Sequence, residues 1–90
     1  NMAWGTDVLF NPAGALTQGK QLSKLARWFE NIDVLRLGTS RNAELLALSG
    51  CRNPYPGALG VIQPRALADI LVINGNPLEN PSLIADPERN

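Results

Sequence analysis

Residues 68–73 of this 90-residue chain have the sequence Ala-Asp-Ile-Leu-Val-Ile, the clearest pattern in the protein. β-Branched residues in a nearly unbroken apolar run are typical of a buried strand. The turn residues Asn-Gly-Asn-Pro follow at 74–77 and end the run. The pattern therefore predicts a strand over 68–73. The polar tail at 78–90 is expected to lie loosely on a surface.

Two shorter segments are also predicted to be strands. Met-Ala-Trp-Gly-Thr-Asp at 2–7 is apolar and stops at a glycine and a polar pair, as the end of a buried strand does. Leu-Gly-Val-Ile at 59–62 is a short apolar run. Turn residues dominate 11–14 and 51–57, so loops are expected there.

Helices are predicted in the middle of the chain. The first is expected from residue 16 or 17 to Asn31, because apolar residues recur there at i, i+3, i+4 and i+7. Two short helices are expected at 33–38 and 41–49. Ser40 and Glu44 are predicted to cap the start of the last helix, and Gly50 to end it. The stripe of the first helix consists of Leu22, Leu25, Ala26 and Phe29.

Composition excludes several classes of protein. The chain has no histidine, so it cannot by itself build a Ser-His-Asp or Cys-His site or nearly any catalytic zinc site. Eight Lys and Arg residues balance eight Asp and Glu residues. This balance removes the electrostatic case for binding nucleic acid or an anionic membrane. The sequence contains neither a signal peptide nor an apolar run of membrane-spanning length, so a cytoplasmic location is expected.

Asp7 is the first candidate for chemistry. A carboxylate just past the C-terminal end of a buried strand is where α/β barrels place catalytic groups. The alternative is a turn aspartate that accepts hydrogen bonds from local backbone amides. The position of Asp7 in the sequence leaves both interpretations open.

Structural roles are expected for the other conspicuous residues. Asp69 interrupts an apolar strand and is predicted to accept hydrogen bonds from nearby backbone amides. Cys51 is the only cysteine, lacks a histidine partner and is predicted to fill apolar space. Trp4, Trp28 and Phe29 are predicted to lie in a core or an interface.

Five motifs in the chain have a recognisable order. They are Gly-Thr-Asp at 5–7, Asn-Ala-Glu-Leu-Leu at 42–46, Leu-Gly-Val-Ile-Gln-Pro at 59–64, Ala-Leu-Ala-Asp-Ile-Leu-Val at 66–72 and Asn-Gly-Asn-Pro-Leu at 74–78. In this order they resemble the C-terminal end of the metal-dependent amidohydrolase superfamily. Within it, the chain is most similar to the branch of imidazolonepropionase and Xaa-Pro dipeptidase (prolidase-like). The resemblance extends over nearly the whole chain.

The resemblance implies an α/β fold. The chain would be a truncated piece that holds the last strand and helices of an amidohydrolase TIM barrel and strands of the accompanying β-sandwich. Residues 1–50 would be the end of the barrel, with its catalytic loop. Residues 51–90 would return into the β-sandwich domain and end in the polar tail. The family usually has glycine where this chain has Arg65, so the turn there is expected to be altered or strained.

The resemblance also implies a role for Asp7. In the family, the aspartate after the last barrel strand binds the metal, zinc or another divalent ion, and takes a proton from the attacking water. Such enzymes hydrolyse amide, peptide or cyclic C–N bonds. The histidine and lysine ligands of the family come from earlier strands and have no counterpart here. This chain alone is therefore expected to bind no metal and to be inactive.

Association is expected for such a piece. Its helical stripe and its strand would expose apolar surface and unpaired backbone, so we expect it to bind itself, as a homo-oligomer, or the remainder of the barrel. The alternative to a hydrolase piece is a non-enzymatic helical and β module that associates with itself or with a larger subunit.

Overall fold

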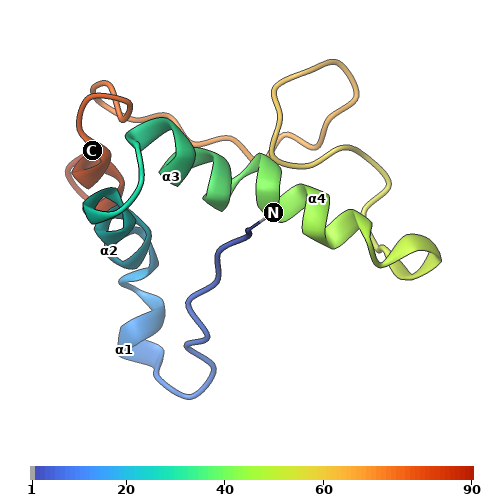
Figure 1. The fold of residues 1–90 in the computed structure, drawn as a ribbon, viewed down its shortest axis with the longest axis horizontal. Helices are drawn as coiled ribbons and strands as arrows, with labels where there is room; N and C mark the ends of the chain where they lie inside the picture. The colour runs from blue at the N-terminus through green and yellow to red at the C-terminus, as the bar shows by residue number, and fades with distance from the viewer. Residues whose placement is uncertain (1) are drawn as a thin grey trace.

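Short helices joined by irregular segments make up the computed structural model, which describes residues 2–90 (Figure 1). Figure 1 shows α3 and α4 following one another along nearly one line, with α1 and α2 at one end of the molecule. In chain order the elements are the helices α1 (Pro12–Ala15) and α2 (Gln18–Ser23), the 3-10 helix η1 (Lys24–Arg27), the helices α3 (Asn31–Gly38) and α4 (Ser40–Ala47), and the 3-10 helices η2 (Gly50–Arg52) and η3 (Pro81–Ala85).

The predicted α/β fold is wrong for the part of the chain that the structure describes. None of the strands expected at 2–7, 59–62 and 68–73 forms, and an isolated parallel bridge between Ala58 and Ala66 is the sole strand-like pairing among residues 2–90. Neither a terminal strand of a TIM barrel nor the strands of a β-sandwich is therefore present there. The physical reason is that a helix closes its own backbone hydrogen bonds, whereas a strand needs a neighbour.

The predicted helix pair is confirmed, while the first predicted helix is wrong in outline. α3 and α4 coincide closely with the expected segments 33–38 and 41–49. The expected helix from residue 16 or 17 to Asn31 is divided into α2 and η1, and Asn31 begins α3 instead of ending a helix. The loop expected at 11–14 holds α1. Asn11 caps it by accepting a hydrogen bond from the Gly14 amide at 2.9 Å.

Two local predictions around α4 have opposite outcomes. Ser40 is the first residue of α4 and its hydroxyl makes no capping hydrogen bond, so the predicted cap with Glu44 is wrong. Glu44 instead pairs with Arg41 at 2.9 Å. Gly50 lies beyond the end of α4 with a φ of 57°, the left-handed conformation expected of a glycine at the end of a helix.

The buried core is very small and lies on α3. Among the described residues, Val34 (0% exposed) and Leu37 (7%) are the only buried hydrophobic side chains. Leu22 of α2 packs close to the backbone of α3, since a Cβ placed on Gly38 would lie 2.8 Å from Leu22 Cδ2. α2 and α3 therefore approach one another where α3 has no side chain.

The C-terminal tail is packed, contrary to the loose segment expected. η3 lies against α2, as Figure 1 shows. The Asn31 side-chain amide donates to the carbonyl oxygen of Leu78 at 2.8 Å, and the Asn74 amide donates to the carbonyl oxygen of Asn90 at 2.9 Å. The first of these hydrogen bonds holds the tail on α3, and the second ties its last residue to the turn at residue 74.

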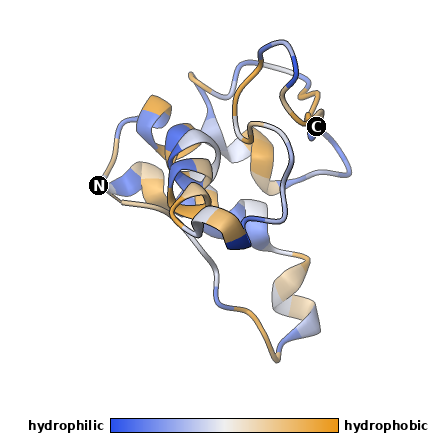
Figure 2. Ribbon diagram, turned by 90° about the vertical axis from the view of Figure 1, so that its right-hand side faces the viewer, coloured by the Kyte–Doolittle hydropathy of each residue, from blue (hydrophilic) through white to orange (hydrophobic). Residues whose placement is uncertain are grey.

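Much apolar surface remains uncovered. Phe10 is 98% exposed, Val72 92% and Ile62 90%. Figure 2 shows apolar segments both on the packed helices and on the irregular parts of the chain. Exposed apolar side chains outnumber buried ones, so few apolar contacts stabilise the packing of the helices. No helix within residues 2–90 has the length and the apolar character needed to cross a membrane.

The turn at Arg65 is strained, as predicted. Arg65 has a φ of 68°, in the left-handed region that residues with a Cβ adopt at a cost of about 1–2 kcal/mol. Glycine would take this conformation without that cost.

Candidate functional site

An asparagine side chain anchors the segment that carries Asp7. The backbone N–H of Trp4 donates to Asn42 Oδ1 at 2.8 Å, and Asn42 Nδ2 donates to the carbonyl oxygen of Trp4 at 2.9 Å. The amide of one side chain thereby satisfies both backbone groups of one residue, as a neighbouring strand would. The otherwise unpaired N-terminal segment is fixed to α4 by this pair of hydrogen bonds.

Asp7 lies three residues beyond this anchor on an exposed part of the chain. Its φ is 51°, a left-handed conformation that aspartate tolerates better than most residues. Within residues 2–90 its carboxylate makes neither a hydrogen bond nor an ion pair. The hydrogen bonds to local amides that a turn aspartate would make are therefore not formed, and the carboxylate is open to an outside partner.

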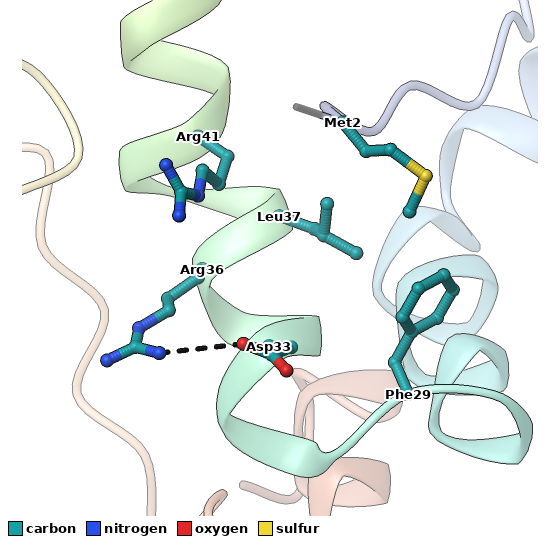
Figure 3. Close-up of a pocket in the computed structure, with 6 residues that line it drawn as sticks. All are labelled: Met2, Phe29, Asp33, Arg36, Leu37 and Arg41. Atoms are coloured by element: carbon teal, nitrogen blue, oxygen red, sulfur yellow. Dashed lines mark hydrogen bonds and ion pairs between the residues drawn. The ribbon is translucent and has the colours of Figure 1, made fainter.

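A shallow cavity of about 260 Å³ lies between the N-terminal segment and α3 (Figure 3). Figure 3 shows Met2, Phe29 and Leu37 on its apolar side, while the guanidinium groups of Arg36 and Arg41 point away from these three residues. Asp7 does not line this cavity. The cavity is thus lined by three apolar and three charged side chains and is separate from the candidate carboxylate.

The charged side chains that line the cavity are engaged in ion pairs. Arg36 pairs with Asp33 at 3.5 Å, and Arg41 pairs with Glu44 at 2.9 Å. All four side chains are between 46% and 60% exposed. Exposed pairs of this kind contribute at most about 1 kcal/mol each, and they do not form the buried, convergent polar cluster of an active site.

The described residues do not by themselves fit a metal ion. No group of three or more His, Cys, Asp or Glu side chains within residues 2–90 is arranged to hold one. Asp7 would supply a single carboxylate, and a catalytic zinc needs three protein ligands. The other ligands of any metal bound at Asp7 must therefore come from outside this part of the chain.

The structure corrects two of the structural interpretations. Asp69 is exposed and accepts no hydrogen bond from the described residues, so its predicted bonding to backbone amides is wrong. Cys51 is exposed and does not fill apolar space. Trp28 is 71% exposed, so it lies outside the core, and of its two predicted places the interface stays a prediction. Trp4 is half-buried beside Asn42, and Phe29 is half-buried at the cavity.

Asn42 is the residue that the sequence analysis missed. It belongs to one of the motifs, yet no role could be assigned to it. The available signal was an asparagine, a weak helix former, in the first turn of an amphipathic helix. Here the Asn42 side chain forms its hydrogen bonds with the backbone of Trp4.

The part of the chain that the structure describes is thus a small helical fold, in which the unpartnered carboxylate of Asp7 lies three residues beyond the anchored Trp4. Comparison with protein-family models, with curated proteins and with solved structures finds no match.

Replacing Asn42 by alanine is expected to release the N-terminal segment without melting α4. Two hydrogen bonds to Trp4 are lost at a net cost of about 1–2 kcal/mol, while alanine favours the helix. Amide hydrogen exchange of Trp4 should accelerate about tenfold or more, because 1.4 kcal/mol corresponds to a factor of ten. Glu44→Ala in the same helix is the control and should leave this exchange rate unchanged. An equally protected Trp4 amide in Asn42→Ala would show that the anchor is unimportant.

Proposed function

We propose that this chain contributes a metal-binding carboxylate, Asp7, to a metal-dependent hydrolase of amide, peptide or cyclic C–N bonds, and that it does not catalyse the reaction alone. The histidine and lysine ligands, and with them the zinc or other divalent metal, belong to residues outside this chain. The proposal assigns Asp7 a place in the ligand set and assigns no substrate beyond the C–N bond class.

The single structural observation that supports this proposal is the state of Asp7. Its carboxylate is exposed and has no partner among the described residues, and its segment is tied to α4 through Trp4. A carboxylate that stabilises its own loop would instead accept hydrogen bonds from nearby amides. The reaction class is what the resemblance of the five motifs to the amidohydrolase superfamily implies.

A second candidate function is supported by the uncovered apolar surface. Side chains such as Phe10, Leu48 and Leu71 are more than three-quarters exposed, whereas just two hydrophobic residues of the described chain are buried. Apolar surface on this scale is typical of a segment that binds another protein. In this alternative the chain is a non-enzymatic module that associates with itself or with a larger subunit.

Complementation in trans separates the two candidates. The chain is mixed with an amidohydrolase cut before its own Gly-Thr-Asp motif, which retains the His-x-His pair, the lysine and the two further histidines, and zinc-dependent hydrolysis is measured. The first candidate predicts that the mixture gains activity. Asp7→Asn should reduce the gained activity by about 100-fold or more, since an acid–base carboxylate typically contributes 10²–10⁴-fold.

The matched control is Asp33→Asn, which removes a carboxylate that is exposed and distant from Asp7 in the sequence. It should leave the complemented activity unchanged. If the mixture binds but gains no activity, the hydrolase proposal is wrong and the binding module remains. Equal losses in Asp7→Asn and Asp33→Asn would also contradict the role of Asp7.

A further inference from the structure

Residues 68–73 form an extended segment whose backbone groups have no partner in the described chain. No hydrogen bond within residues 2–90 involves an amide or carbonyl of this segment. Ile70 is 59% exposed, Leu71 83% and Val72 92%. Residues of this type favour strands, and their unpaired backbone is a template for another strand.

Hydrogen bonds on both sides define the length of this open edge. The Leu67 amide donates to the carbonyl oxygen of Ala58 at 2.9 Å, and the Asn74 amide donates to the carbonyl oxygen of Asn90 at 2.9 Å. The segment between them is therefore held at both ends. Less conformational entropy is lost when a tethered segment is paired than when an untethered one is.

Charge decides between the possible pairings of two copies. Asp69 is the one charged residue of the segment. Parallel in-register pairing would place the two Asp69 carboxylates on neighbouring strands about 5 Å apart. Antiparallel pairing centred on Ile70 would bring them to diagonal positions about 7–8 Å apart. Both distances lie within the screening length of about 8–10 Å, so the carboxylates would repel one another.

Antiparallel pairing centred on Leu71 avoids this repulsion. Asp69 then lies opposite Ile73, and the two carboxylates are four residues apart along the ribbon, about 14 Å. A centre one residue further along would place Ile70 opposite the polar Asn74. With the centre at Leu71, the two Asp69 carboxylates are far apart. Leu71 then pairs with Leu71 of the other copy, Ile70 with Val72, and Ile73 with Asp69.

We propose that two copies of this chain associate through residues 69–73 as an antiparallel, two-fold symmetric strand pair centred on Leu71. This proposal deepens the second candidate function and names its partner, a second copy of the chain. Ile70 lies opposite Val72 of the other copy, so these four side chains share one face of the ribbon. The chain has a net charge of zero, so no overall repulsion opposes the association.

Cysteine cross-linking tests the register in the full chain. All variants carry Cys51→Ser, because Cys51 is exposed and would react itself. Leu71→Cys, Ile70→Cys and Val72→Cys are oxidised singly, and Ile70→Cys is also oxidised in a mixture with Val72→Cys. Each replaced side chain is more than half exposed, so the monomer should fold unchanged. Light scattering of the native chain gives the mass in parallel.

The proposal predicts a mass of twice 9.7 kDa at high concentration. It also predicts covalent dimers from Leu71→Cys alone and from the mixture of Ile70→Cys with Val72→Cys, whereas each of these two alone stays at background. A mass of one chain at every concentration overturns the proposal. Equal cross-linking of all three single variants indicates parallel pairing and overturns the proposal. A dimer in which no variant cross-links also overturns it. None of these readouts depends on hydrolysis, so failure here is distinct from failure of the role proposed for Asp7.

Discussion

Replacing Gly19 by alanine is expected to detach η3 from α2, although alanine is the better helix former. A Cβ at position 19 would fall on the carbonyl oxygen of Ile84 and lie 3.0 Å from its carbonyl carbon. Both contacts are with backbone, so no side-chain rotation can relieve them. Overpacking of this kind costs about 1–3 kcal/mol or more, against a gain of about 1 kcal/mol in helix propensity. The expected net effect is a loss of packing over the tail.

Amide hydrogen exchange and limited proteolysis of residues 78–90 measure this effect. In Gly19→Ala both should be faster than in the native chain, with the helical signal of α3 and α4 retained. Gly5→Ala is the matched control, because a Cβ at Gly5 meets no atom within 4 Å. A rise in melting temperature for Gly19→Ala, as helix propensity alone predicts, would contradict the close approach of α2 and η3.

Replacing Val34 by alanine is expected to have the second large effect. Val34 is the one fully buried large side chain in the described chain. Removing its two methyl groups forfeits transfer free energy and leaves a cavity, at a cost of about 2–3 kcal/mol. Even proteins with a core of ordinary size have a free energy of unfolding of only about 5–15 kcal/mol. With so small a core, we expect Val34→Ala to be largely unfolded at room temperature.

Urea unfolding followed by circular dichroism measures this loss. The control is Val72→Ala, which removes the same atoms from a side chain that is 92% exposed. Its stability should change by less than about 0.5 kcal/mol when the chain is dilute enough to be a monomer. Equal effects of the two substitutions would mean that α3 is not the centre of the fold.

The helices were predictable to the extent that their own residues decide them. α3 and α4 coincide with the expected pair because amphipathic spacing, Gly38 at the end of α3 and Gly50 shortly after α4 are local signals. The divided helix over α2 and η1 was not predictable from its stripe of apolar residues. Its last turn is 3-10 and Asn31 bonds to the tail instead of ending a helix, both of which depend on segments remote in sequence.

The candidate site was predictable in part. Asp7 was identifiable as a carboxylate after a glycine and a threonine. Its anchor could not be identified, since Asn42 meets Trp4 only when α4 is placed beside the N-terminal segment. The cavity is likewise made by residues from the N-terminal segment, α3, α4 and the turn before α3. The spacing of residues within one helix does not indicate contacts between segments that are remote in sequence.

By itself, the sequence determined the two central helices and the strand-forming character of residues 68–73. Each depends on local backbone preference and on the side chains of the segment itself. Tertiary structure alone decided that residues 68–73 remain unpaired, that η3 covers α2 and that Asn42 holds Trp4. Strand pairing and helix docking need a partner at the right distance, and whether that partner is present is a property of the whole arrangement.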